Sequence, residues 1–97
     1  MSSENPRRIV FSHFALIGKA ISHGHRLEMI DLMAQAERSV EDMARILRLS
    51  VANTSQHLQQ LRRVGLVATR KEGQRVFYRL SDDAVIELLG SLRHIAE

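Results

Sequence analysis

The spacing of apolar residues changes twice along this chain of 97 residues, and these changes predict its architecture. Up to residue 64, apolar residues recur every three or four positions, which is typical of helices that bury one face. Between 66 and 80 they alternate with polar residues, as in half-buried strands. The helical spacing returns from 82 to the end. The pattern therefore predicts the order α-α-α-α-β-β-α, a mainly α (α+β) fold.

Four helices are expected before the strands. A serine hydroxyl accepts a hydrogen bond from an N–H group of the first helical turn, so Ser39 and Ser50 are expected to cap the third and fourth helices. Gly65 is expected to end the fourth. Two helices joined by so short a connection predict a helix-turn-helix. The expected ranges are 8–21 and 26–36 for the first two helices, a short segment after Ser39 for the third, and 51–64 for the fourth.

A β-hairpin and one more helix are expected after this motif. Segments 66–71 and 75–80 are rich in β-branched and aromatic residues. Residues 72–74 between them suit a turn, because Gly73 tolerates a positive φ. Ser81 is expected to cap the last helix, whose apolar residues form a stripe. A hairpin that follows a helix-turn-helix predicts a winged helix-turn-helix.

Length and composition limit the class of protein. With 44% hydrophobic and 26% charged residues, the chain suits one globular domain, which we expect over 8–97 after a flexible polar arm over 1–7. The absence of cysteine excludes disulfides and thiolate metal sites. No long apolar run or signal peptide is visible, so we expect a cytoplasmic protein with no membrane partner. No phosphate-binding glycine loop, HExxH motif or nucleophile elbow is present, so we expect no enzyme.

Basic residues are concentrated in one part of the chain. The net charge is +3, but residues 62–79 contain six basic residues against one acidic residue and carry +5, leaving −2 for the rest. A localised basic stretch is typical of phosphate contact, although a solvated charged face would look the same. The cations that we expect to contact DNA phosphates are Arg62, Arg63, Arg70, Lys71 and Arg75, whereas Arg79 is expected to be structural.

One face of the predicted 51–64 helix is suited to reading base edges in the major groove. Thr54, Leu58 and Leu61 fall on the core side, and the opposite side is rich in amides and hydroxyls and free of carboxylates. Asn and Gln can pair with adenine through two hydrogen bonds. The expected DNA-contacting residues of this face are Ala52, Asn53, Ser55, Gln56, Gln59, Gln60 and Arg63. The alternative is a winged-helix protein-interaction module without specific DNA binding, which would expose aromatic residues or leucine here.

Apolar stripes on the first and last helices predict a homodimer. They exceed what a chain of this length easily covers, although some of their residues could be internal core. A two-fold dimer would set its recognition helices about 34–36 Å apart and would require an inverted-repeat operator in double-stranded DNA. The stripes comprise Phe14, Ile17 and Ile21 on the first helix, and Leu88, Leu92 and Ile95 on the last.

The segment 49–80 resembles the DNA-binding core of ArsR/SmtB-type winged-helix repressors. The resemblance extends over about 10–96, although Gly24 and His25 stand where the family commonly has Pro-Thr. It implies a homodimer that represses transcription from an inverted repeat and is released by an effector. The matching positions are Ser50, His57-Leu58, Leu61-Arg62, Gly65-Leu66-Val67 and Glu72-Gly73.

The resemblance implies release by an effector, and the family's two metal sites are the first candidates for its sensor. The family's cysteine site at the start of the third helix is absent, because 39–44 read SVEDMA. A second family site ends in His-x-x-Glu, which His94 and Glu97 match, but Asp83 stands where a His is expected and Ser81 where an Asp is. Asp83, His94 and Glu97 could still hold zinc across a dimer.

Alternatively, the sensor lies elsewhere. Segments 22–33 and 50–63 resemble regulators that are fused to a C-terminal rhodanese domain, which implies that this chain is the N-terminal part of a longer protein. Within the chain, His23 and His25 are expected to support a helix junction, with metal binding as the alternative. His57 is expected to pack beside the core without titrating in any functional way.

Overall fold

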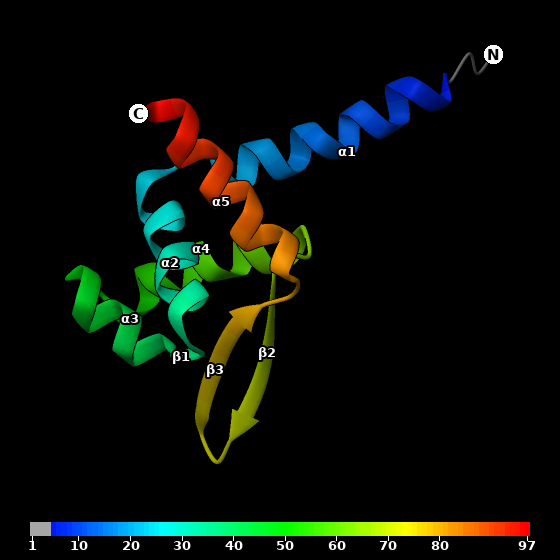
Figure 1. The fold of residues 1–97 in the computed structure, drawn as a ribbon. Coiled ribbons are helices and arrows are strands. Elements are labelled where there is room, and N and C mark those ends of the chain that lie inside the picture. Colours follow the sequence, from blue (N-terminus) through cyan, green and yellow to red (C-terminus); the bar gives the residue numbers. More distant parts are fainter. Residues whose placement is uncertain (1–4) are drawn as a thin grey trace.

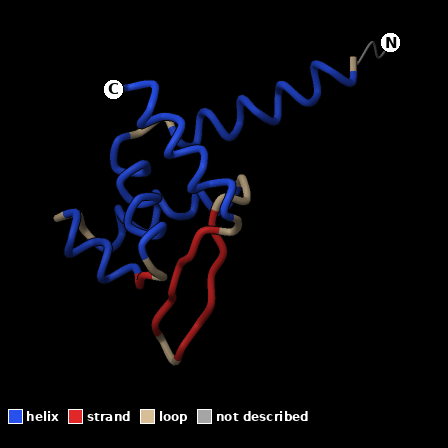
Figure 2. The backbone as a smooth tube through the Cα atoms, viewed as in Figure 1, coloured by secondary structure: helices blue, strands red, loops and turns tan. Residues whose placement is uncertain are grey.

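The computed structural model describes residues 5–97, and the predicted element order is confirmed with one addition, a short strand before the third helix. The strand escaped prediction because two residues are too few to show an alternating pattern. Figure 1 shows the elements in chain order, and Figure 2 separates helices from strands by colour. The elements are α1 (Pro6–Ile21), α2 (Gly24–Gln35), β1 (Arg38–Ser39), α3 (Val40–Leu47), α4 (Val51–Arg63), β2 (Val67–Glu72), β3 (Arg75–Leu80) and α5 (Asp83–Ala96).

The three strands form one antiparallel sheet in the order β1-β3-β2. β2 and β3 pair along their whole length, from Val67 opposite Leu80 to Glu72 opposite Arg75. The turn is therefore one residue shorter than expected, because Glu72 belongs to the ladder. Gly73 supplies the positive φ, +62°, that such a tight turn requires.

The core lies where α2, α3 and α4 meet one end of the sheet. Its fully buried side chains come from each of these helices, with Met29 from α2, Met43 from α3, and Leu58 and Leu61 from α4. Tyr78 of β3 closes the core from the sheet side. The core side predicted for the fourth helix is confirmed, because Thr54, Leu58 and Leu61 are all buried. This packing fixes which face of α4 turns outward.

Two predicted helix caps are confirmed and one is wrong. Ser39 Oγ accepts a hydrogen bond from the backbone N–H of Asp42 (3.1 Å), and Ser50 caps α4 in the same way. Asp82, and not Ser81, caps α5, since its Oδ1 accepts from the N–H of Ala84 (2.8 Å). The Ser81 hydroxyl instead donates to the carbonyl of Gly65 (2.6 Å), which ties the end of the hairpin to the segment after α4.

The first two helices begin earlier than expected. Asn5 Oδ1 accepts from the N–H of Arg7 (2.9 Å), and Pro6 occupies the first turn, where its missing N–H costs nothing. The end of the expected arm over 1–7 is therefore helical, and residues 1–4 lie outside the described part. α2 begins at Gly24 because the His23 side chain caps it, so the His-Gly-His segment starts a helix.

Two parts of the molecule project from the body (Figure 1). The N-terminal half of α1 extends beyond the other helices, and the β2–β3 hairpin extends in a different direction as a wing. α1 carries exposed apolar side chains at Ile9, Val10, Phe11 and Phe14. No helix within residues 5–97 combines the length and the apolar character that a membrane crossing needs. The exposed apolar side chains of the projecting α1 indicate a surface that another chain could cover.

Candidate nucleic-acid interface

α4 presents one continuous polar face to solvent. Its residues 51–63 include no Asp or Glu, so the face carries no charge that would repel phosphates. Six of the expected contact residues are exposed there, and Ser55 and Gln60 are half-buried at its edges. The structure thus brings the predicted residues together on the outer side of a helix that is anchored by its inner side. The exposed ones are Ala52, Asn53, Gln56, Gln59, Arg62 and Arg63.

A hydrogen bond from Arg26 fixes the middle of α4 against the start of α2. Arg26 Nε donates to His57 Nδ1 (3.1 Å), and Arg26 Nη1 donates to the carbonyl of Ala20 at the end of α1 (3.1 Å). The His23 ring lies 4.5 Å from the His57 ring, measured between centroids. Burial lowers the pKa of His57, and the neighbouring His23 and Arg26 lower it further. The neutral form that accepts from Arg26 is therefore favoured, so His57 does more than pack.

The wing arginine Arg70 is held by two carboxylates of its own chain. Its guanidinium lies 2.8 Å from Glu37 and 2.7 Å from Glu72, and 4.6 Å from the centroid of the Phe77 ring. The hydrogen bonds to Glu37 and then Glu72 raise the pKa of Arg70. The hydrogen bond from Arg70 lowers the pKa of Glu72. Contact between Arg70 and a DNA phosphate would have to compete with both carboxylates.

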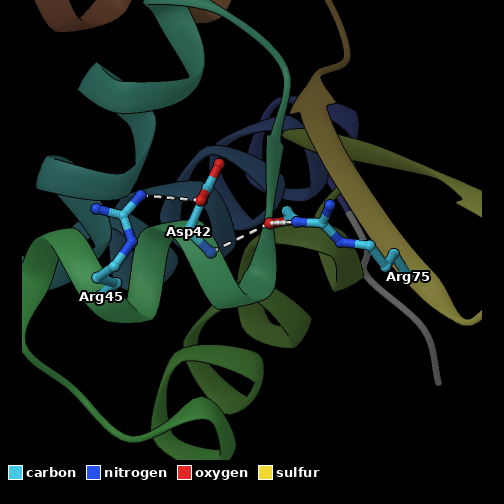
Figure 3. A network of polar contacts seen from close by, with 4 residues as sticks. Asp42, Arg45 and Arg75 are labelled. Carbon is cyan, nitrogen blue, oxygen red and sulfur yellow. Dashed lines mark hydrogen bonds and ion pairs between the residues drawn. The ribbon is translucent and has the colours of Figure 1, made fainter.

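Arg75 reaches back from β3 to the start of α3 (Figure 3). Its Nη2 donates to Ser39 Oγ (3.0 Å), the same atom that caps α3. Asp42 and Arg45 form an ion pair on the neighbouring turn (2.9 Å), as Figure 3 shows. The fully buried Ser39 hydroxyl therefore joins the wing to the helix-turn-helix. Sequence reasoning missed this link, because 36 residues separate its two members.

Three of the cations that were predicted to contact phosphates form no side-chain hydrogen bond or ion pair with another described residue. Within residues 5–97, no hydrogen bond or ion pair engages the side chains of Arg62, Arg63 or Lys71, and all three are exposed. Two of them end α4, and the third lies near the tip of the wing. Among the predicted phosphate contacts, these three can meet an external anion without breaking an internal contact. Arg79, which was expected to be structural, is also exposed, and no hydrogen bond or ion pair engages its side chain within the same residues.

The residues proposed for zinc do not meet within one chain. Asp83 begins α5, whereas His94 and Glu97 lie at its other end, about 16 Å and about 21 Å away at the rise of a helix. Within residues 5–97, no three His, Asp or Glu side chains gather in a way that could hold a metal ion. Zinc held jointly by two chains stays a prediction.

Four of the six predicted dimer residues line one apolar groove between α1 and α5. Phe14, Ile17, Ile21 and Leu88 line a groove of about 320 Å³ between the two helices. Ile17 and Ile21 also pack against the core, so the internal alternative holds for part of this set. Phe14 is 56% exposed, and of the two remaining stripe residues Leu92 is 36% and Ile95 79% exposed.

Comparison with known protein families and sequences gives consistent matches. The family model described as "Bacterial regulatory protein, arsR family" matches residues 23–69. The chain is 47% identical over 77 residues to the transcriptional activator HlyU of Vibrio cholerae, covering 76% of this chain and 71% of that protein. It is 35% identical over 98 residues to an HTH-type transcriptional regulator of Mycobacterium tuberculosis. That alignment covers all of this chain and only 43% of the relative, so the chain spans less than half of that protein's length.

A solved structure matches the fold over nearly the whole chain. It is the solution structure of the homodimeric winged helix-turn-helix DNA-binding domain, fragment 1–100, of a Mycobacterium bovis protein. The TM-score is 0.87 at 35% identity, with 99% of this chain and 90% of that chain covered. The predicted winged helix-turn-helix fold is confirmed.

Proposed function

This chain belongs to the arsR family of bacterial regulatory proteins, and from that premise we propose that it binds double-stranded DNA as a homodimer and represses transcription. The observation that carries the proposal is the outer face of α4. This face carries amide side chains and no carboxylate. Two arginines lie at its end, and no hydrogen bond or ion pair within residues 5–97 engages their side chains. Such a face can enter a major groove without repelling the phosphates on either side.

Each part of the surface has a separate role in this proposal. Gln56 and its neighbours on α4 read base edges, and Arg62 and Arg63 contact phosphates at the groove wall. The wing reaches the adjacent backbone or minor groove, with Lys71 as its available cation. Arg70 and Arg75 mainly hold the wing in place, because each is engaged by residues outside the hairpin. Base reading is thus assigned to α4 alone, and backbone contact to the end of α4 and to the wing.

The homodimer is supported by the apolar surface of α1 and α5. Phe14 and Ile95 are large apolar side chains that are mostly exposed in the single chain, as is typical of residues that a partner covers. The similar Mycobacterium bovis domain is described as homodimeric. A two-fold dimer would place the two α4 helices about one turn of DNA apart, so we expect an inverted-repeat operator.

Repression and an effector are further parts of the proposal. The Vibrio cholerae relative is named an activator, so the direction of regulation rests on the resemblance to winged-helix repressors. Zinc at Asp83, His94 and Glu97 is one proposed effector, and a sensor in an additional domain, such as a rhodanese domain, is the other. The protein-interaction alternative is not favoured, because the outer face of α4 presents amides and cations where such a module would present apolar side chains.

Fluorescence anisotropy tests the proposal. The protein is titrated onto a labelled duplex from the region upstream of its own gene and onto a scrambled duplex of the same composition, with and without zinc. We expect at least 1,000-fold tighter binding to the operator than to the scrambled duplex. Equal affinity for the two would contradict specific binding and would favour the interaction module. Release by zinc would identify the effector, whereas selective binding that zinc does not change would assign sensing to another ligand.

A further inference from the structure

A cavity of about 450 Å³ lies between the end of α1, the start of α2 and the last turns of α4. Its volume falls within the range of about 300–1,000 Å³ that is typical of small-molecule sites. The polar wall consists of Lys19, His23 and Arg26 on one side and of Gln60 and Arg63 on the other. The rest of the lining is mostly apolar and consists of Leu16, Ala20, Ser22 and Val64.

The charge of this cavity is strongly unbalanced. Lys19, Arg26 and Arg63 contribute three positive charges from three different helices, and no carboxylate lines the cavity. Elsewhere in residues 5–97, arginines such as Arg70 and Arg93 lie within 4 Å of carboxylates, but none of these three does. Like charges gathered in one cavity repel each other, and a bound anion relieves that repulsion.

Two of the side chains that line the cavity, Arg26 and His23, are already held by internal hydrogen bonds. Arg26 uses Nε for His57 and one N–H of Nη1 for Ala20, so three of the five N–H donors that a guanidinium carries remain. Its plane is fixed by those two bonds, which lowers the entropy lost on binding a ligand. His23 Nδ1 accepts from the N–H of His25, so the neutral His23 ring carries its proton on Nε2 and offers one more donor.

We infer that this cavity binds a phosphate group. A phosphate offers several acceptor oxygens and up to two negative charges, which matches a set of converging donors with three positive charges. The fixed Arg26 fork suits two phosphate oxygens at once. Lys19 is exposed, and its flexible side chain lets the ammonium group adjust to the position of the bound phosphate.

The location of the cavity connects phosphate binding to DNA binding, an inference that rests on the proposed function. Gln60 and Arg63 belong both to the cavity and to the DNA-contacting face of α4. Arg26 also holds His57, one turn from Gln60 on the same helix. The phosphate can come from the DNA backbone or from a small phosphorylated molecule. A DNA phosphate would strengthen operator binding, and a small molecule would compete with DNA for Arg63.

A titration with inorganic phosphate tests the site without DNA. Amide NMR signals are followed while sodium chloride keeps the ionic strength constant. We expect saturable shifts confined to the residues around Lys19–Arg26 and Gln60–Val64. Binding should be at least tenfold weaker in Lys19→Gln, whose exposed side chain holds nothing else within residues 5–97. It should be unchanged in Arg8→Gln, which removes an exposed cation of α1 that does not line the cavity. The NMR spectrum of each variant reports whether it folds. Arg63→Gln is a second test of the site and should also weaken phosphate binding.

The dependence of DNA affinity on salt identifies the source of the phosphate. A slope of log K against log salt that falls by about 0.9 in Lys19→Gln would assign the site to the DNA backbone. Phosphate binding to the free protein with an unchanged slope would assign it to a small molecule. No saturable phosphate binding together with an unchanged slope would overturn the inference. A protein that bound phosphate but no DNA would refute the proposed function and leave the site intact.

Discussion

Arg26 Nε, in the first turn of α2, donates a 3.1 Å hydrogen bond to His57 Nδ1 in the middle of α4. The bond requires a histidine nitrogen with a free lone pair, so it exists only while His57 is neutral. Burial and the cationic neighbourhood favour that neutral form by lowering the pKa of His57. One of the contacts that hold α4 against α2 therefore depends on the protonation of His57, the neighbour in sequence of the expected base-reading residue Gln56.

The stability of the protein should fall in mild acid because of His57. The unfolded chain, with a histidine pKa near 6.5, binds a proton more readily than the folded chain does. The free energy of unfolding should therefore decrease as the pH drops below about 6.5, with no contribution from His57 well above that value. Urea unfolding from pH 7.5 to pH 5 measures this decrease, which should be smaller in His57→Asn, since asparagine accepts a hydrogen bond but does not titrate.

The matched control for this prediction is His13→Asn, which replaces an exposed histidine on α1. It should keep the pH dependence of the original protein. If His57→Asn lost as much stability in acid as the original protein does, His57 would not be the group responsible.

Replacing Ser39 with alanine should destabilise the fold more than replacing Ser50. Loss of a serine cap costs about 1 kcal/mol, within a range of about 0.5–2 kcal/mol. Ser50 Oγ accepts one bond at an exposed helix start. Ser39 Oγ accepts both from Asp42 and from Arg75, and it is fully buried. We expect Ser39→Ala to exceed Ser50→Ala by about 1 kcal/mol in urea unfolding, for the additional bond to a charged donor. Equal costs would show that the contact with Arg75 contributes no stability.

Gln56→Ala should reduce the specificity of DNA binding. A side chain that pairs with a base through two hydrogen bonds contributes about 1–3 kcal/mol of discrimination. Binding to the operator should weaken by that amount, while binding to random DNA should stay the same. Anisotropy titrations on both duplexes provide the comparison. An equal loss on the two duplexes would place Gln56 among the phosphate contacts instead.

Neighbouring cations of the wing should differ in their contribution to salt dependence. Lys71 is exposed and outside any ion pair of residues 5–97, whereas Arg70 is held by Glu37 and Glu72. Lys71→Ala should lower the slope of log K against log salt by about 0.9, the value for one phosphate contact. Arg70→Ala should lower it by less, because its charge is already compensated. The reverse order would mean that DNA displaces both carboxylates from Arg70.

Phe14→Asp should dissociate the dimer without unfolding the subunit. More than half of the Phe14 side chain is exposed, so the subunit core does not need it, but a charge there would oppose association of the α1 surfaces. Light scattering at micromolar concentration should give a dimer for the original protein and a monomer for the variant. The control is Ile46→Asp, which charges an exposed apolar residue of α3 and should remain a dimer. A monomeric original protein would contradict the proposed assembly.

Local features of the chain were predictable, because they depend on residues that are close in sequence. Apolar spacing placed the helices and the hairpin, and two serines marked the starts of α3 and α4 correctly. At α5 the prediction of Ser81 as the cap was wrong, because Asp82 takes that role. The Ser81 hydroxyl instead donates a hydrogen bond to the carbonyl of Gly65, which lies 16 residues earlier in the chain.

The contacts that decide which cations are available were not predictable in this way. Arg70 looked like a free wing cation until the fold placed Glu37 beside it, 33 residues away in the chain. Arg26 gave no local signal at all, and its contact with His57 spans 31 residues. Patterns of residue types identified the surface of the site, but only the three-dimensional arrangement separates its free charges from its compensated ones.

The projecting apolar α1 also affects how the regulator would respond to its own abundance. If a second copy covers Phe14 and its neighbours, the DNA-binding form is a pair, whose amount rises with the square of the free subunit concentration. Halving the synthesis of the protein would then cut operator occupancy by up to fourfold when dimers are scarce. A single extended helix would thereby turn a gradual change in expression into a sharper threshold of transcriptional control.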